Sequence, residues 1–297
     1  MIACLIAPVV HAKISQWTPI DTSEGWIKVA SAINGIEGYS IIDSGANLHA
    51  INEAFLREAK LELHKIGRGS RVQGVVGEEV VGNYAPINVR VFGEELEFRS
   101  LRGLDLGDPN LQLLIGAGFL RHFIFQFDYP QNRMRLMSRD AVNMKKVANV
   151  PSKSARGAGT PLVKVRLNDE LDVWLVLDTG STGGVLLDRN VVDRTSWLEE
   201  YEQSAGTIQG VVESGQTHSF VLPSVKFGPF DLGGVAIRTQ AEGKEFKMFE
   251  QSTYTGTHIP RSSTEAVGLL GYQVLKHFVI TLDYRSGRVH VGTRASP

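Results

Sequence analysis

The chain has 297 residues, of which 31 are Lys or Arg and 32 are Asp or Glu, so its formal net charge is −1. This balance excludes the sustained positive field that a nucleic-acid-binding surface needs. Apolar residues make up 42% of the chain, and 31 glycines beside 11 prolines indicate many tight turns and hence a β-rich globular fold.

The N-terminal segment, residues 1–12, is apolar and ends in Val-His-Ala, which resembles the end of a signal peptide. It is short and lacks a basic start, so we expect a truncated signal segment and a periplasmic or secreted protein. A buried first strand in a cytoplasmic protein is the alternative. Cys4 is the single cysteine, which excludes a disulfide within one chain, and no apolar run approaches the ~20 residues of a membrane span.

Three short motifs occur twice and in the same order, once in each half of the chain. The separations are 178 − 43 = 135, 209 − 73 = 136 and 269 − 114 = 155 residues. The pairs are Asp43-Ser44-Gly45-Ala46 with Asp178-Thr179-Gly180-Ser181, Gln73-Gly74-Val75 with Gln209-Gly210-Val211, and Leu114-Ile115-Gly116 with Leu269-Leu270-Gly271. This ordered recurrence predicts a tandem duplication of one β-rich lobe.

The two halves meet where residues 150–157 have the composition of a linker. We therefore expect an N-terminal lobe over residues 13–150 and a C-terminal lobe over residues 151–297. The separation of the motifs grows by 155 − 136 = 19 residues, which places an insertion between about Gln240 and Glu265. Its polar, Gly- and Pro-punctuated composition predicts a surface loop.

Local patterns predict matching elements in the two halves. Strands are expected where apolar and other residues alternate, and Asn34-Gly35 and Asn168-Asp169 are turn signals between paired strands. The expected strands cover residues 26–33, 39–42, 162–167 and 173–177, helices cover 52–60 and 116–123, and closing hairpin turns cover 128–132 and 283–287. Each acidic motif therefore follows directly on a strand.

A single Asp-Ser/Thr-Gly triplet is most simply a turn, because Asp and Gly both favour turns. Two such triplets at matching places of a repeat favour a paired carboxylate site instead. Two aspartates brought together do not both ionise easily, so one keeps a proton while the other stays charged. In a pair formed by Asp43 and Asp178, the charged member takes a proton from water and the protonated member polarises a carbonyl.

The residues around each aspartate have expected supporting roles. Gly45 and Gly180 let the backbone turn tightly beneath the carboxylates. The hydroxyls of Ser44 and Thr179 are placed to cross between the lobes and lock the two loops together.

This set of motifs resembles the retropepsin- and pepsin-like aspartic proteases. In both halves an Asp-Ser/Thr-Gly-Ala/Ser motif is followed by a Gly-containing hairpin about 30 residues later, and then by two apolar residues and a Gly before a short helix. The chain looks most like a small bacterial-type aspartyl protease with two fused retropepsin-like lobes. The resemblance implies a mostly β fold with two pseudo-symmetric β-barrel lobes, a few short helices and a cleft between the lobes.

The resemblance also implies the roles of individual residues. Asp43 and Asp178 are the implied catalytic dyad, and the leucine-containing motifs ending at Gly116 and Gly271 pack behind the dyad loops. The implied support for the dyad comes from Ser44, Gly45, Ala46, Thr179, Gly180 and Ser181. The implied flaps over the substrate contain Gln73, Gly74, Val75, Gln209, Gly210 and Val211, although repeated bulged hairpins without that role are the alternative.

The expected activity is hydrolysis of peptide bonds in extended substrates, by a two-lobed monomer that needs no cofactor or metal. The sequence contains no His-Glu-x-x-His pattern and no dinucleotide-binding glycine loop. The expected partner is a peptide or protein, with no nucleic acid and no transmembrane span. The alternative is a catalytically idle peptide-binding protein on the same fold.

One difference between the two motifs predicts an unequal dyad. The resemblance implies that the residue after each glycine lies beside the carboxyl of its own motif, so Ser181 would donate a hydrogen bond to Asp178 and favour its charged form, whereas Ala46 has no hydroxyl to donate to Asp43. We therefore expect Asp43 to hold the shared proton. Restoring the donor with Ala46→Ser is then expected to move the basic limb of the pH–rate profile downward.

Overall fold

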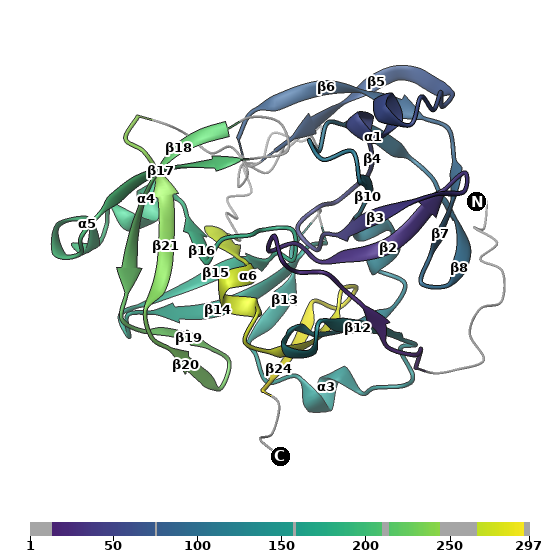
Figure 1. Cartoon of the computed structure of the whole chain (residues 1–297). Coiled ribbons are helices and arrows are strands. Elements are labelled where there is room, and N and C mark those ends of the chain that lie inside the picture. The colour runs from purple at the N-terminus through teal and green to yellow at the C-terminus, as the bar shows by residue number, and fades with distance from the viewer. Residues whose placement is uncertain (1–13, 75, 157–158, 210–213, 244–265, 294–297) are drawn as a thin grey trace, which may run out of the picture.

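The computed structural model describes residues 14–74, 76–156, 159–209, 214–243 and 266–293 (Figure 1). The expected mostly β class is confirmed, because the strands of three sheets make up about half of the described chain and the helices are short. The helices are α1 (Glu53–Glu58), α2 (Ala117–Leu120), α3 (Met144–Val147), α4 (Arg189–Val192), α5 (Trp197–Glu200) and α6 (Tyr272–Leu275), with one 3₁₀ turn, η1 (Tyr129–Gln131).

Two large sheets each draw their strands from one half of the chain. In spatial order, the first contains β5 (Lys65–Gln73), β6 (Glu78–Tyr84), β9 (Leu101–Leu104), β4 (His49–Asn52), β10 (Leu111–Ile115), β3 (Ile36–Ile42), β2 (Lys28–Ile33), β7 (Ile87–Val91) and β8 (Glu94–Phe98). The second contains β17 (Ser204–Gln209), β18 (Ser214–Leu222), β21 (Val235–Gln240), β16 (Val185–Leu187), β22 (Gly268–Leu270), β15 (Leu171–Leu177), β14 (Pro161–Leu167), β19 (Val225–Phe227) and β20 (Phe230–Leu232), with β13 (Ser152–Ser154) beside β14.

The two sheets use the same order of strands, and the same pairs are parallel. In the first sheet β3 and β10 are parallel, as are β4 and β9. In the second sheet β15 and β22 are parallel, as are β16 and β21. The strands that precede the two acidic motifs, β3 and β15, therefore hold matching places in their sheets.

Neither sheet closes on itself within the described residues. The pairings run from β5 to β8 in one sheet and from β17 to β20 in the other, and the end strands of each sheet do not pair. The expectation of β-barrel lobes is therefore wrong about closure, and both sheets are open. Alternation along the sequence predicts strands but not which sheet edges meet.

The turns that follow β2 and β14 form as their sequences predict. Asn34 and Gly35 have φ angles of 52° and 78°, and Asn168 and Asp169 have φ angles of 50° and 55°. Two successive positive φ angles define the tight hairpin turn that matches the twist of paired strands, and Asn, Asp and Gly adopt them most readily. These hairpins fix the register of the strands that lead to the acidic motifs.

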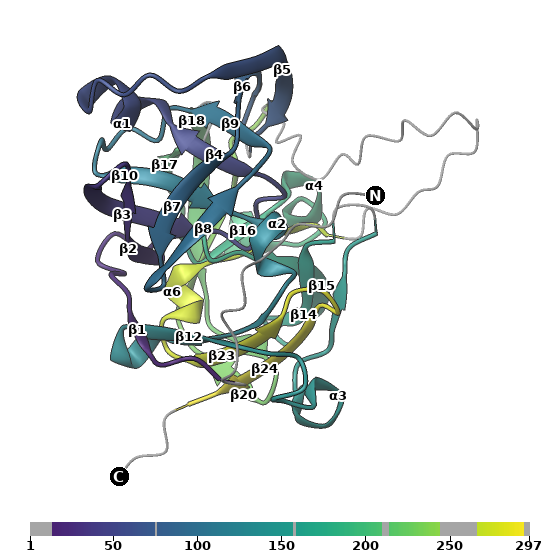
Figure 2. The ribbon, with the colours of Figure 1, turned by 90° about the vertical axis from the view of Figure 1, so that its right-hand side faces the viewer.

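A third sheet joins the two halves of the chain (Figure 2). Its strands in spatial order are β1 (Thr18–Pro19), β12 (Arg133–Met137), β11 (Ile124–Asp128), β23 (Val279–Asp283) and β24 (Arg288–Gly292). The central pair, β11 and β23, is antiparallel, and the Gln126 side chain donates a hydrogen bond of 3.0 Å to the Thr281 hydroxyl across it. The halves are therefore hydrogen-bonded to each other through their own strands.

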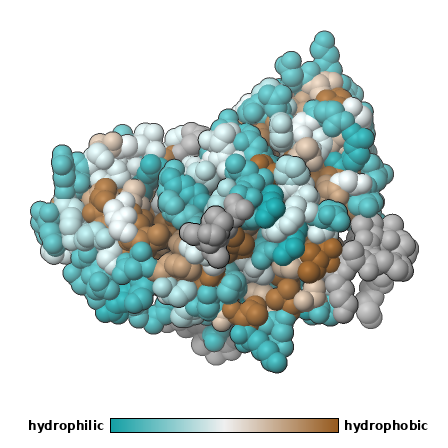
Figure 3. Space-filling model, turned by 60° about the horizontal axis from the view of Figure 1, so that its bottom comes forward, coloured by the Kyte–Doolittle hydropathy of each residue, from teal (hydrophilic) through white to brown (hydrophobic). Residues whose placement is uncertain are grey.

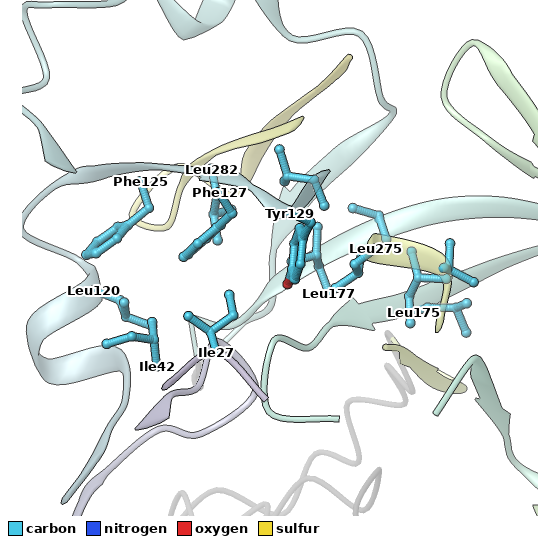
Figure 4. Close-up of a cluster of buried hydrophobic side chains, with 14 of the residues drawn as sticks. Ile27, Ile42, Leu120, Phe125, Phe127, Tyr129, Leu175, Leu177, Leu275 and Leu282 are labelled. Carbon is cyan, nitrogen blue, oxygen red and sulfur yellow. The ribbon is translucent and has the colours of Figure 1, made fainter. Parts of the chain in front are cut away.

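The hydrophobic core continues from this sheet into both halves (Figure 4). Phe125 and Phe127 on β11 belong to the same buried cluster as Ile42 at the end of β3 and Leu177 at the end of β15. Burial of such side chains contributes roughly 1.5–3 kcal/mol each. This continuous packing fixes the two acidic motifs relative to each other.

The stretch predicted as a linker is partly built into the sheets. Val150 forms an isolated bridge with Val289, and β13 pairs with β14.

At the surface, large exposed apolar side chains are scattered over several elements, and apolar patches alternate with polar residues on the face in Figure 3. None of the helices in the described part of the chain is long and apolar enough to cross a membrane.

Candidate active site

The two acidic motifs form loops at the ends of β3 and β15, and each loop is held by the same pair of backbone hydrogen bonds. The Asp43 N–H donates to the Ile115 carbonyl and the Asp178 N–H donates to the Leu270 carbonyl, both at 3.0 Å. Farther along, the Ala117 N–H donates to the Ala46 carbonyl at 2.9 Å and the Tyr272 N–H donates to the Ser181 carbonyl at 2.8 Å.

These bonds place the leucine-containing motifs directly behind the loops. Gly116 and Gly271 occupy places with no room for a side chain: a Cβ on Gly116 would lie 2.2 Å from the Leu48 carbonyl oxygen, and one on Gly271 would lie 2.7 Å from the Gly183 carbonyl oxygen. Glycine is therefore required at both positions for close backbone approach.

The hydroxyl residues of the two loops bond across to each other's backbone. The Ser44 hydroxyl donates to the Leu177 carbonyl at 2.6 Å and accepts from the Thr179 N–H at 3.0 Å. The Thr179 hydroxyl donates to the Ile42 carbonyl at 2.7 Å and accepts from the Ser44 N–H at 2.9 Å. Ser44 is 0% and Thr179 is 1% exposed, so four buried backbone groups depend on two hydroxyls.

The two carboxylates meet between the loops. Asp178 is buried, with 8% of the residue exposed, Asp43 is partly buried, and the charge of Asp43 raises the pKa of Asp178. Each also lies against the glycine of the opposite loop, because a Cβ on Gly45 would lie 2.7 Å from the Asp178 carboxyl group and one on Gly180 would lie 2.5 Å from that of Asp43. The two glycines therefore serve close approach across the loops rather than a tight turn of positive φ.

Backbone amides donate to both carboxyl groups. Oδ1 of Asp43 accepts from the N–H groups of Gly45 at 2.8 Å and Ala46 at 2.9 Å, and Oδ1 of Asp178 accepts from that of Gly180 at 2.8 Å. Burial raises the pKa of both carboxyls and the amide donors oppose this rise at both, while the negative charge of Asp43 raises the pKa of Asp178 further.

The expectation that Asp43 holds the shared proton stays a prediction. It depended on a hydrogen bond from the Ser181 hydroxyl to Asp178. Within the described part of the chain Ser181 makes no such bond to Asp178, and its Oγ lies instead 2.7 Å from where a Cβ on Gly271 would be.

Both predicted flap sequences lie at the ends of β-hairpins, β5–β6 and β17–β18, which reach toward each other at the top of Figure 1. Gln73 ends β5, Gly74 follows it, and Gln209 ends β17. Val75, Gly210 and Val211 lie outside the described residues, as does nearly all of the predicted insertion between Gln240 and Glu265.

Apolar side chains connect the hairpins to the strands behind the dyad. Val72 of β5 packs in a buried cluster with Leu114, and Ile208 of β17 packs against a second cluster that contains Leu269. Val76 also packs against the second cluster, so the tip of the first hairpin reaches the other half of the chain. Sequence reasoning did not single out Val76, and only its place next to Val75 signals this contact.

Two buried tyrosines near the dyad were also missed. Tyr129 and Tyr284 follow β11 and β23, and neither hydroxyl has a hydrogen-bond partner in the described chain. Burial raises the pKa of both, and the charge of Asp178 adds to the effect at Tyr129 as that of Asp43 does at Tyr284. In the sequence, each tyrosine directly follows an aspartate, Asp128 or Asp283, and this pattern predicts only a turn.

His49 is a third residue that the sequence did not reveal. Its Nδ1 accepts a hydrogen bond of 3.2 Å from the Gly116 N–H, directly behind the first dyad loop. A lone histidine in an apolar strand gives no sign of a partner 67 residues away. Among the described residues, no group of three or more His, Cys, Asp or Glu side chains is arranged to hold a metal ion.

Comparison with known proteins supports the general family that the sequence motifs resemble. Residues 163–274 match a family model described as aspartyl protease, a stretch that includes Asp178 and most of the second sheet. No curated protein sequence matches the chain. The match supports a relationship of this part of the chain to the retropepsin-like aspartyl proteases and indicates a peptidase.

Proposed function

We propose that the chain is an aspartic endopeptidase in which Asp43 and Asp178 activate a water molecule against the peptide bond of an extended substrate. The observation that carries this proposal is the placement of the two carboxyls between the loops, each packed against the glycine of the opposite loop and each with a pKa raised by its surroundings. Two acids are placed in contact there although both are costly to ionise, which is the arrangement of a dyad that shares one proton.

We infer that Asp43 is the charged member and Asp178 the protonated member of the pair, because the charge of Asp43 raises the pKa of Asp178. Asp43 takes a proton from water as the water oxygen attacks the carbonyl carbon, and Asp178 gives its proton to the carbonyl oxygen. The resulting tetrahedral diol collapses when Asp43 passes its proton to the amide nitrogen and a diol hydroxyl returns a proton to Asp178. The C–N bond then breaks, the amine and a carboxylic acid are released, and both aspartates are back in their starting states. The cross-loop bonds of Ser44 and Thr179 keep the acids in contact.

The proposal includes a duplicated architecture. We infer two pseudo-symmetric lobes, over residues 13–150 and 151–297, with the substrate in a cleft between them and under the two hairpins. The matching strand orders, the repeated anchoring bonds of the loops and the contact of Val76 with the second half support this reading. Main-chain hydrogen bonds would hold the substrate as an extended strand.

Cleavage of a diverse peptide library between acid and neutral pH tests the proposed activity. Asp43→Asn and Asp178→Asn are expected to lower kcat/KM at least about a hundredfold, because general acid–base catalysis contributes that much or more. Asp169→Asn is the matched control, since Asp169 is exposed in a turn where Asn also fits. A statine inhibitor should block cleavage.

Three results would count against the proposal: full activity in either dyad variant, loss of activity on chelation, or no cleavage of any peptide. Peptide binding without turnover in the unchanged chain would favour the idle peptide-binding alternative.

Export is the remaining part of the proposal. Sequencing the N-terminus of the protein recovered from each cellular compartment tests it, and an intact Met1 in the cytoplasm would contradict it.

A further inference from the structure

A cavity of about 820 Å³ lies in the first half of the chain, beside β8 and α2, and its lining does not include either dyad aspartate. Ligand sites for small molecules and peptide side chains have volumes of about 300–1,000 Å³. Its apolar wall is aromatic: Phe92 and Phe119 are stacked with ring centroids 5.6 Å apart, and Phe98 lies 5.9 Å from Phe119.

The polar group of this wall is His49, whose side chain is more than nine-tenths buried, with 9% of the residue exposed. Its Nδ1 accepts the Gly116 N–H, so in the neutral ring the proton is on Nε2. Nε2 lies beside Gly118, where a Cβ would come within 2.3 Å of it, and no described residue accepts its hydrogen. The Nε2–H of His49 is therefore available in the cavity lining to donate to an acceptor of a bound molecule.

The rim carries unpaired negative charge. Glu94 and Glu95 are exposed and have no ion pair within the described ranges, whereas Glu97 pairs with Arg99. The other cation of the rim, Arg102, donates to the Ser100 carbonyl. A cationic group next to Glu94 and Glu95 would therefore find complementary charge.

The cavity begins where the first dyad loop ends. Asn47 and Leu48 line it, and Asn47 is four residues after Asp43, so at most about 14 Å of extended chain separates the two. A peptide that lies across the dyad can span that distance with about four of its own residues. This favours a peptide over an unrelated small molecule as the occupant.

We propose that this cavity is a secondary peptide-binding site that takes an aromatic side chain next to a basic residue. A backbone carbonyl of the peptide accepts the Nε2–H of His49, the ring enters the aromatic wall, and the Arg or Lys faces Glu94 and Glu95. The site then selects substrates at a distance from the scissile bond, a role that rests on the proposed endopeptidase function.

Binding is tested first, without turnover, by calorimetry on the full chain carrying Asp43→Asn. The probe is acetyl-Arg-Phe-amide, and acetyl-Arg-Ala-amide and acetyl-Glu-Phe-amide are its controls. His49→Asn keeps an acceptor for the Gly116 N–H, but its shorter side chain places no donor at the position of Nε2, and we expect it to weaken probe binding about two- to tenfold. His64→Asn, on an exposed histidine outside the cavity lining, should leave binding unchanged.

The rim is tested separately in case His49→Asn does not fold. Glu94→Gln with Glu95→Gln changes only exposed side chains, and it should abolish the preference of the chain for acetyl-Arg-Phe-amide over acetyl-Glu-Phe-amide. In active enzyme, the same pair of substitutions should raise KM for substrates carrying Arg-Phe while leaving kcat unchanged.

No binding of the probe at millimolar concentration, or equal binding by the unchanged and rim-substituted chains, would overturn the proposal. The two proposals fail in different ways. A chain that binds the probe through His49 and the rim but cleaves no peptide would contradict the endopeptidase function alone. A chain that cleaves peptides without regard to Arg-Phe and does not bind the probe would contradict the secondary site alone.

Discussion

The glycines behind the two dyad loops have the same role but different partners. The Gly271 N–H donates to a backbone carbonyl, that of Gly184, at 2.8 Å. The Gly116 N–H donates instead to Nδ1 of His49 at 3.2 Å. The two acceptors also come from different places: His49 is the first residue of β4, and Gly184 directly precedes β16.

The N–H groups of the two glycines are thus satisfied by different acceptors, an imidazole nitrogen behind the first loop and a backbone carbonyl behind the second. A carbonyl accepts a hydrogen bond at every pH, but an imidazole nitrogen accepts only while the ring is neutral. Burial, and then the positive charge of Arg121, lowers the pKa of His49 to about 4. The support behind the first loop is therefore sensitive to acid in a way that the support behind the second is not.

The largest effect is expected from filling the space between the loops. Gly45→Ala and Gly180→Ala each force a Cβ against the opposite carboxyl, so we expect kcat/KM to fall at least about a hundredfold, as misplacement by 1 Å can cause. Gly183→Ala is the control, because nothing lies within 4 Å of its Cβ position. Activity of either variant within a few fold of the unchanged enzyme would contradict the packing described.

Acid is expected to destabilise the first half through His49. The unfolded chain binds a proton at His49 below the ordinary pKa of 6.5 and the folded chain binds it only near 4, so stability is lost as the pH falls between these values. The linked loss approaches about 3 kcal/mol. Urea unfolding from pH 7 to pH 4 measures it, and His49→Asn should remove this component while His64→Asn should not. Parallel curves for the unchanged chain and His49→Asn would refute the assignment.

The cross-loop hydroxyls allow a matched comparison of the two loops. Ser44→Ala removes two buried hydrogen bonds and should lower the free energy of unfolding by about 2 kcal/mol. Thr179→Ser keeps the hydroxyl and loses only a methyl group, so its loss should be about 1 kcal/mol or less. Denaturant titration of both variants measures these losses in the free energy of unfolding. Equal losses would mean that packing rather than hydrogen bonding stabilises the loops.

The smallest effect is expected at Ala46. The Ser181 hydroxyl of the second loop lies toward Gly271 rather than toward the dyad, so a hydroxyl introduced by Ala46→Ser should lie toward Gly116. The pH–rate profiles of Ala46→Ser and the unchanged enzyme should therefore superimpose. A downward shift of the basic limb would restore the original expectation that the missing hydroxyl leaves the proton on Asp43.

Features that depend on neighbouring residues could be predicted from the sequence. The turns at Asn34-Gly35 and Asn168-Asp169 form as expected, since their residues themselves favour positive φ. The helix expected over residues 52–60 forms as α1, which the Asn52 side chain caps by accepting from the Ala54 N–H. The repeats also pointed to the two loops that the fold brings together.

Features that depend on distant groups could not be predicted. The role of His49 depends on Gly116, which is 67 residues away in the sequence. Closure of the sheets was wrongly expected, because it depends on which edges meet after folding. The same limit applies to the aromatic cavity, which joins residues from several separate segments of the chain.

The antiparallel pairing of β11 with β23 affects how the two halves of the chain assemble and how far the halves can differ. Ile124 pairs with Asp283 and Asp128 pairs with Val279, so the start of each strand meets the end of the other. Two identical strands meet in this way across the axis of an isologous dimer. Because β11 and β23 belong to one chain, their pairing is intramolecular and does not depend on protein concentration, as the pairing of two separate subunits would. Within one chain the two halves can also differ: the Gly116 N–H meets an imidazole and the Gly271 N–H meets a carbonyl, whereas identical subunits would make the same bond twice.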